Sequence, residues 1–140
     1  MHVRVPESGR FDMSDMSVLI VDDDESLVRE LAAKLRGEGY EVLVGMDGLQ
    51  ALMQAQRKGP DLILLDMRMP AGDGFFVLDK LDDSIKTMRI PVIAMIAPED
   101  AESVEKARAY GADEIIMKPF DADRLLELVS RRLAPPEVPQ

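Results

Sequence analysis

The chain has 140 residues, of which 46% are hydrophobic, and its 27 acidic and 17 basic side chains give a formal net charge of -10. This length supports one domain with its own core and is short for two. The negative charge argues against direct binding of a nucleic-acid phosphate backbone by this domain and favours proteins and cations as partners. There is no cysteine, which excludes disulfides and thiolate metal sites.

No apolar run in the chain approaches the ~18 residues that a membrane-spanning helix needs. Residues 1–5 also lack the apolar core of a signal peptide. With no cysteine in the chain, a reducing cytoplasm is the simplest setting. We therefore expect a cytoplasmic protein that does not interact with membranes.

Short apolar runs dominate the chain after a first segment without periodicity, residues 1–16, which is expected to be a flexible leader. Five of these runs are too short for helices and are predicted to be strands, at residues 18–21, 40–44, 62–65, 92–96 and 114–117. The run at 40–44 carries Glu41, which places it at an edge of the sheet.

The segments between and after these runs carry apolar residues at helical spacing, and helices are predicted to begin near residues 26, 48, 74, 98 and 121. The second helix is expected to pack through Leu49, Leu52 and Met53. Pro98 and the acids after it mark the start of the fourth helix, the least apolar one. Prolines stop regular structure at the carboxyl end, so residues 135–140 are interpreted as a tail or the start of a linker.

Strands that alternate with helices predict right-handed crossovers and a parallel sheet covered on both faces. An eight-unit barrel needs about 250 residues, more than this chain has. With the polar second strand outside, the strand order is 2-1-3-4-5, a flavodoxin-like (βα)5 doubly wound α/β fold over residues 17–134. The switch point of this sheet lies between strands one and three, whose ends carry Asp22, Asp23 and Asp66.

Three carboxylates at one edge of the sheet repel each other, at a cost of ~1 kcal/mol per close pair in water and ~4 kcal/mol in a shielded site. A cation is therefore expected among Asp22, Asp23 and Asp66. Without cysteine, and with His2 of the leader as the one histidine, the chain offers oxygen ligands that favour Mg²⁺ over zinc. Lys118, at the end of strand five, adds a second positive charge. This arrangement suits an incoming phosphoryl group, with Asp66 as the predicted acceptor.

The chain resembles the receiver domain of bacterial two-component response regulators over residues 18–133. The resemblance lies in Val21-Asp22-Asp23-Asp24, Leu65-Asp66, Met69-Pro70, Asp73-Gly74, Gly111-Ala112 and Lys118-Pro119-Phe120. It implies a signalling domain, not an enzyme of the usual kind, that catalyses its own phosphorylation and dephosphorylation. The implied phosphoryl donor is a histidine kinase or a phosphotransfer protein. A downstream protein partner or an output domain would respond, and a homodimer is compatible with the resemblance.

The same resemblance implies a role for each residue of the site. Asp66 is the implied phosphoacceptor, and Lys118 and Ala97 are the implied contacts of the phosphoryl group. The Lys118–Pro119 peptide bond is expected to be cis. The implied metal site consists of Asp23, Asp66, the backbone carbonyl of Arg68, and Asp22 acting through metal-bound water.

Two positions depart from the family's pattern. Ile96 stands where members usually have Ser or Thr, whose hydroxyl contacts the phosphoryl group, and Ile115 stands where they tend to have an aromatic residue. Both parts of the usual conformational relay are missing, so we expect a non-standard output switch. Phosphoryl acceptance needs only the acids, the metal and Lys118, and is expected to remain. The Arg68 side chain either shields the pocket from water or faces solvent.

Two other functions compete with this interpretation. Asp22-Asp23-Asp24-Glu25-Ser26 also fits the DxDx[T/S] opening of haloacid dehalogenase-like phosphatases, with Asp22 as nucleophile and Asp24 as acid and base. The chain is short for that fold, and this alternative leaves the segment at 66–70 unexplained. The second alternative is a receiver-like module that binds a partner without phosphorylation, which Ile96 and Ile115 favour.

Overall fold

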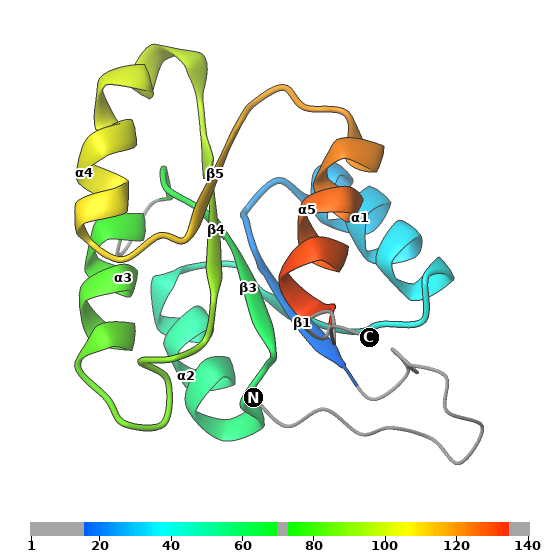
Figure 1. The fold of residues 1–140 in the computed structure, drawn as a ribbon, viewed down its shortest axis with the longest axis horizontal. Coiled ribbons are helices and arrows are strands. Elements are labelled where there is room, and N and C mark those ends of the chain that lie inside the picture. The colour runs from blue at the N-terminus through cyan, green and yellow to red at the C-terminus, as the bar shows by residue number, and fades with distance from the viewer. Residues whose placement is uncertain (1–15, 70–72, 135–140) are drawn as a thin grey trace, which may run out of the picture.

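A five-stranded parallel sheet lies between two layers of helices in the computed structural model, which describes residues 16–69 and 73–134 (Figure 1). The strands are β1 (Ser17–Val21), β2 (Glu41–Gly45), β3 (Leu62–Asp66), β4 (Val92–Ile96) and β5 (Glu114–Met117). Their order is β2-β1-β3-β4-β5, and every neighbouring pair is parallel. The predicted flavodoxin-like fold is confirmed. Most of the predicted leader, the predicted tail and Pro70 lie outside the described residues.

The helices cover both faces of the sheet. They are α1 (Glu25–Gly37), α2 (Gly48–Lys58), α3 (Gly74–Asp82), the 3₁₀ helix η2 (Pro98–Ser103), α4 (Val104–Ala109) and α5 (Ala122–Leu133). Helices α1 and α5 pack on one face, and α2, α3 and α4 pack on the other (Figure 1). Because all five strands are parallel, their carboxyl ends lie at the same edge of the sheet, and every connection to a following helix begins there.

The central strands β1, β3 and β4 are almost wholly buried, and their side chains alternate between the two faces. Ile20 and Leu64 point into the core beneath α1 and α5. Leu19 and Leu65 point into the core beneath the other three helices. Continuous apolar runs are the expected sequence of strands that are covered on both faces, so the runs identified in the sequence mark the centre of the sheet.

The predicted packing face of α2 was right for Leu52, which packs against the core, and wrong for Leu49 and Met53. Leu49 is 62% exposed and Met53 is 51% exposed, while Ala51 and Ala55 are buried. The backbone of α2 lies close to the end of β2, because a Cβ added at Gly45 would come within 3.1 Å of the Ala51 nitrogen. Only small side chains fit at so close an approach, so the helix turns Ala51 and Ala55 inward and leaves Leu49 and Met53 exposed.

The predicted fourth helix is divided into two parts. Its first part is η2, which has no buried residue and no side-chain cap at Ala97. Asp100 interrupts the helical conformation with φ -109° and ψ 20°. Its second part, α4, buries Ala107 against the sheet. Of the two parts, α4 is therefore the one that contributes a buried side chain to the core.

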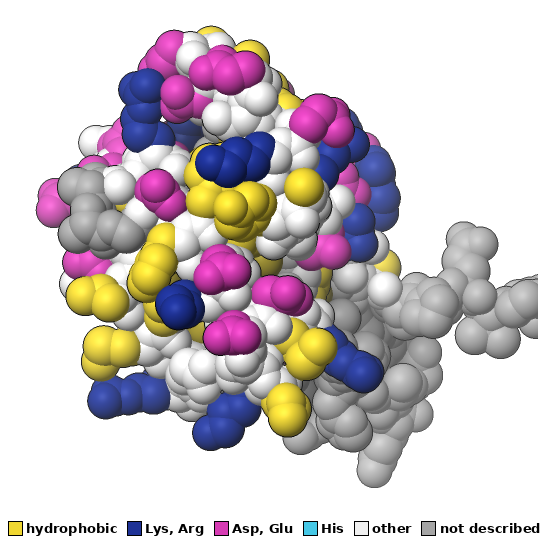
Figure 2. Space-filling model, turned by 90° about the vertical axis from the view of Figure 1, so that its left-hand side faces the viewer, with side chains coloured by type: hydrophobic (Ala, Val, Ile, Leu, Met, Phe, Trp, Pro, Cys, Tyr) yellow, Lys and Arg dark blue, Asp and Glu magenta, His cyan; other side chains and the backbone are white. Residues whose placement is uncertain are grey.

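Exposed hydrophobic side chains remain on the side of the molecule that carries α3 and α4, interspersed with acidic and basic groups (Figure 2). The larger exposed ones in the described part of the chain are Leu49, Met53, Phe76, Ile85, Met88, Tyr110 and Met117. Across residues 16–69 and 73–134, we find no helix with the length and apolar character needed to cross a membrane.

Candidate phosphoryl and metal site

Three carboxylates meet where β1 and β3 end side by side. Asp22 directly follows β1, and Asp66 is the last residue of β3. Carboxylate oxygens of Asp22, Asp23 and Asp66 all lie within 4.8 Å of one another. Asp22 and Asp66 are buried and Asp23 is exposed. The structure thus brings together the three acids that the sequence places at the switch point.

The acidic run at the start of α1 divides between two tasks. The Asp24 carboxylate accepts hydrogen bonds from the backbone N–H groups of Ser26, at 3.1 Å, and Leu27, at 3.2 Å, and so caps α1. The Asp22 carboxylate accepts the backbone N–H of Asp24 at 2.9 Å and faces the pocket. The Asp24 carboxylate therefore serves as the cap of α1, while the carboxylates of Asp22 and Asp23 belong to the cluster with Asp66.

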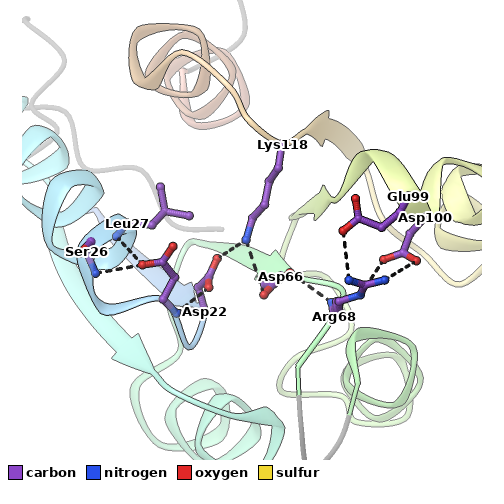
Figure 3. A network of polar contacts seen from close by, with 9 residues as sticks. Asp22, Ser26, Leu27, Asp66, Arg68, Glu99, Asp100 and Lys118 are labelled. Atoms are coloured by element: carbon purple, nitrogen blue, oxygen red, sulfur yellow. Dashed lines mark hydrogen bonds and ion pairs between the residues drawn. The ribbon is translucent and has the colours of Figure 1, made fainter.

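Lys118 reaches into this cluster from the end of β5 (Figure 3). Its Nζ donates to Oδ2 of Asp22 at 2.8 Å and lies 3.6 Å from Oδ2 of Asp66. Burial alone would lower the pKa of Lys118, but the hydrogen bond to Asp22 and the charge of Asp66 outweigh burial and raise the pKa. The lysine is therefore a fixed positive charge between two acids. The Lys118–Pro119 bond is cis, as predicted.

Burial and neighbouring charge raise the pKa of Asp66 to about 6, with burial the larger cause and the negative charge of Asp22 the next. The backbone N–H of Arg68, which donates to Oδ1 of Asp66 at 3.1 Å, and the charge of Lys118 act in the opposite direction. The Lys118 ammonium and this hydrogen bond therefore do not offset burial and the neighbouring carboxylates. A divalent cation would relieve the remaining repulsion, and clustered carboxylate oxygens are the donors that Mg²⁺ prefers.

The Arg68 side chain points away from the buried acids and toward η2. Its guanidinium contacts Glu99 at 3.1 Å and Asp100 at 3.1 Å (Figure 3). These two acids were not predicted as part of the site, because they lie about thirty positions further along the chain and no motif links them to Arg68. The prediction that the carbonyl of Arg68 binds metal stays a prediction.

The remaining predicted positions lie around β4. Ile96 ends the strand with 1% exposure, and Ile115 is partly buried in the core beneath α2, α3 and α4. Ala97 lines the acidic pocket, which has a volume of about 400 Å³. The lining residues are Asp22, Asp23, Asp24, Asp66, Arg68, Met69, Ala97, Glu99 and Lys118. None of these described residues carries a hydroxyl group.

Known proteins share both this sequence pattern and this fold. The model of the response regulator receiver domain family matches residues 18–130. The response regulator PleD of Caulobacter vibrioides is 45% identical over 104 residues, which are 74% of this chain and 23% of PleD. This chain therefore spans less than a quarter of that relative's length.

Solved structures agree with the sequence comparison. A putative response regulator from Chloroflexus aurantiacus matches with a TM-score of 0.80 and 31% identity, over 86% of this chain and 98% of that chain. The receiver domain of the sensor histidine kinase PA1611 from Pseudomonas aeruginosa matches with a TM-score of 0.76 and 30% identity, over 83% of this chain and 95% of that chain. That structure holds a magnesium ion in its active-site cleft.

Proposed function

We propose that this chain, which belongs to the family of response regulator receiver domains, accepts a phosphoryl group on Asp66 in two-component signalling. The observation that carries the proposal is the cluster of Asp22, Asp23 and Asp66 within 4.8 Å, with the Lys118 ammonium between two of its acids. Receiver domains are signalling modules rather than classical enzymes, and they act with histidine kinases.

In the proposed transfer, a carboxylate oxygen of Asp66 forms a bond to phosphorus. The bond between phosphorus and the donor atom breaks, and its electron pair leaves with the donor, a histidine imidazole or an acetate. Asp66 must be ionised to attack, and the Lys118 ammonium favours that form. The same ammonium lies close enough to bind an oxygen of the arriving phosphoryl group, so it both orients the group and neutralises charge.

Mg²⁺ fits the donors present, and we propose that Asp22, Asp23 and Asp66 hold it together with the backbone carbonyl of Arg68. When bound, the ion would neutralise phosphoryl and carboxylate charge. The magnesium ion in the Pseudomonas receiver domain supports this assignment. The donor set supports it independently, since it consists of oxygen atoms.

The proposed output differs from the usual one. Ile96 offers no hydroxyl to a phosphoryl group and is already packed in the core, so a signal cannot pass through a hydroxyl at that position. We place the protein in the cytoplasm, with a histidine kinase or a phosphotransfer protein as phosphoryl donor and a downstream protein partner or an output domain as responder. The family match favours this function over the phosphatase alternative.

Incubation with acetyl phosphate and Mg²⁺, followed by intact-protein mass spectrometry, tests the proposal. We expect the mass of one phosphoryl group to be added to the wild-type protein, and neither Asp66→Asn nor a sample with excess chelator to gain it. Asp79→Asn is the matched control, because Asp79 is an exposed acid on α3. A wild-type protein that gains no mass would contradict the proposal and favour the phosphorylation-independent interaction module.

A further inference from the structure

We propose that Arg68 is a movable contact whose guanidinium leaves Glu99 and Asp100 for the phosphoryl group on Asp66, and that this transfer releases η2. The inference rests on the proposed phosphorylation of Asp66 and assigns a regulatory role to a second side chain at the same site. Arg68 thereby becomes a positioning residue that couples the state of Asp66 to the segment after β4.

Arg68 is placed to contact both groups. Its backbone N–H donates to Oδ1 of Asp66 at 3.1 Å, which fixes the start of its side chain beside the proposed phosphoacceptor. The guanidinium lies at the rim of the same pocket and extends to the two acids of η2 (Figure 3). The side chain of Arg68 is 61% exposed, so rotation toward the pocket is not opposed by packing.

The phosphoryl group would compete well for this guanidinium. Glu99 is 58% exposed and Asp100 is 30% exposed, so solvent screens both existing ion pairs. A phosphoryl group carries a charge of about -1.5 to -2 and three acceptor oxygens, and its geometry matches the paired donors of arginine. Lys118 already contacts Asp22 and Asp66, so Arg68 is the cation, among the described residues that line the pocket, whose charged group is not yet paired with these acids.

If the Arg68 guanidinium left Glu99 and Asp100, η2 would be destabilised more than α4. Helix η2 has no buried residue and no side-chain cap, and among the described residues its ion pairs to other elements are those that Glu99 and Asp100 form with Arg68. Helix α4 is held by other contacts. Its Lys106 ammonium lies 4.3 Å from the ring centre of Phe75 on α3, and Ala107 is buried. The proposed response is therefore local loosening of residues 98–103.

Hydrogen exchange of the backbone amides at 99–103 tests this response, with and without acetyl phosphate and Mg²⁺. We expect phosphorylation to raise the exchange rates of the wild-type protein by about fivefold. In Arg68→Ala these amides should exchange quickly from the start and change little on phosphorylation. Arg124→Ala is the matched control, since Arg124 is 55% exposed and pairs with an acid remote from the site, and it should behave as the wild type.

The lifetime of the phosphoryl group gives a second readout. In hydrolysis, a water oxygen bonds to phosphorus, the bond from phosphorus to the Asp66 oxygen breaks, its electron pair returns to the carboxylate, and the water protons pass to phosphate and solvent. A guanidinium on the phosphoryl oxygens obstructs this approach. We expect Arg68→Ala to shorten the lifetime by about fivefold, Arg68→Lys to restore part of it, and the Glu99→Gln/Asp100→Asn double variant to lengthen it.

The outcomes separate this inference from the proposed function. A wild-type protein that gains a phosphoryl group but shows unchanged exchange at 99–103 overturns the inference and leaves the proposed function standing. The inference is likewise overturned, and the proposed function left standing, if Arg68→Ala retains both the wild-type exchange pattern and the wild-type phosphoryl lifetime. A wild-type protein that gains no phosphoryl group overturns both.

Discussion

The two sides of the acidic pocket are held in different ways. On the side of β1, β3 and β5, Asp22, Asp66 and Lys118 are largely shielded from solvent and contact each other directly. On the side of β4, the exposed side chain of Arg68 pairs with Glu99 and Asp100 of η2, a helix with no buried residue. The first side has the fixed charges that phosphoryl transfer needs. The second has ion pairs that solvent screens, and we propose that phosphorylation of Asp66 exchanges them.

The largest expected effect is on the rate of phosphorylation, and it comes from Lys118 on the side of β1, β3 and β5. Replacing the ammonium in Lys118→Met should slow phosphorylation by acetyl phosphate by about 100-fold, because it removes the positive charge beside Asp66. Initial rates of mass gain measure this. Lys34→Met is a suitable control, since Lys34 forms an exposed contact with Asp123. A Lys118 variant within a few-fold of the wild-type rate would show that this charge does not act in the transfer.

Neighbouring acids should differ in their effect on Mg²⁺. Asp23→Asn is expected to weaken Mg²⁺ binding by roughly 10- to 100-fold, because it removes a charged oxygen ligand from the cluster. Asp24→Asn should leave affinity within a few-fold, since Asp24 caps α1 and asparagine caps equally well. Calorimetric titration of each variant with Mg²⁺ compares them. Equal losses in both variants would contradict the division of tasks within the acidic run.

Without Mg²⁺, the free energy of unfolding should depend on pH because of the raised pKa of Asp66. Its pKa lies at about 6 in the folded protein, above the ordinary value of 3.8, so the folded state binds more protons than the unfolded state between these values. The contribution of Asp66 to stability therefore falls as pH rises through this window. Asp66→Asn removes the penalty and should stabilise the protein by about 2 kcal/mol at pH values above the window.

Urea denaturation without Mg²⁺ at about pH 4 and about pH 7.5 measures this difference. The variant and the wild type should have similar stability at the lower pH, because the folded wild type is then largely protonated at Asp66. Added Mg²⁺ should favour the wild type and reduce the advantage of the variant. An Asp66→Asn protein that is less stable than the wild type at the higher pH would contradict the description of the pocket as a site of unbalanced negative charge.

The smallest expected effect lies on the side of β4. Ile96→Thr should cost about 1 kcal/mol of unfolding free energy, because it removes buried apolar volume. Its hydroxyl would give the phosphoryl group a partner that the wild type lacks. Phosphorylation should then alter amide exchange in β5 more strongly than in the wild type. An unchanged pattern in β5 would show that Ile96 is not what limits the response.

The sequence correctly predicted that Asp22, Asp66 and Lys118 lie close together, and the reason is physical. Parallel strands end at one edge of a sheet, so acids at the ends of the apolar runs, Asp22 and Asp66, had to lie close together, with Lys118 nearby. The ion pairs of Arg68 were not predictable in this way. They join the loop after β3 to the 3₁₀ helix η2, and no periodicity in the sequence predicts which side chains meet there. The burial of Leu49 was wrongly predicted, because the close approach of the α2 backbone to β2 leaves room for Ala51 and not for the larger side chain.

The identity of the phosphorylated residue tests phosphoryl acceptance most directly. The wild-type protein would be treated with acetyl phosphate and Mg²⁺, its aspartyl phosphate reduced with borohydride, and its peptides sequenced by mass spectrometry. We expect modification at Asp66 alone. Modification at Asp22 would contradict this expectation and favour the phosphatase-like nucleophile, and a protein with no modified aspartate would contradict phosphoryl acceptance altogether.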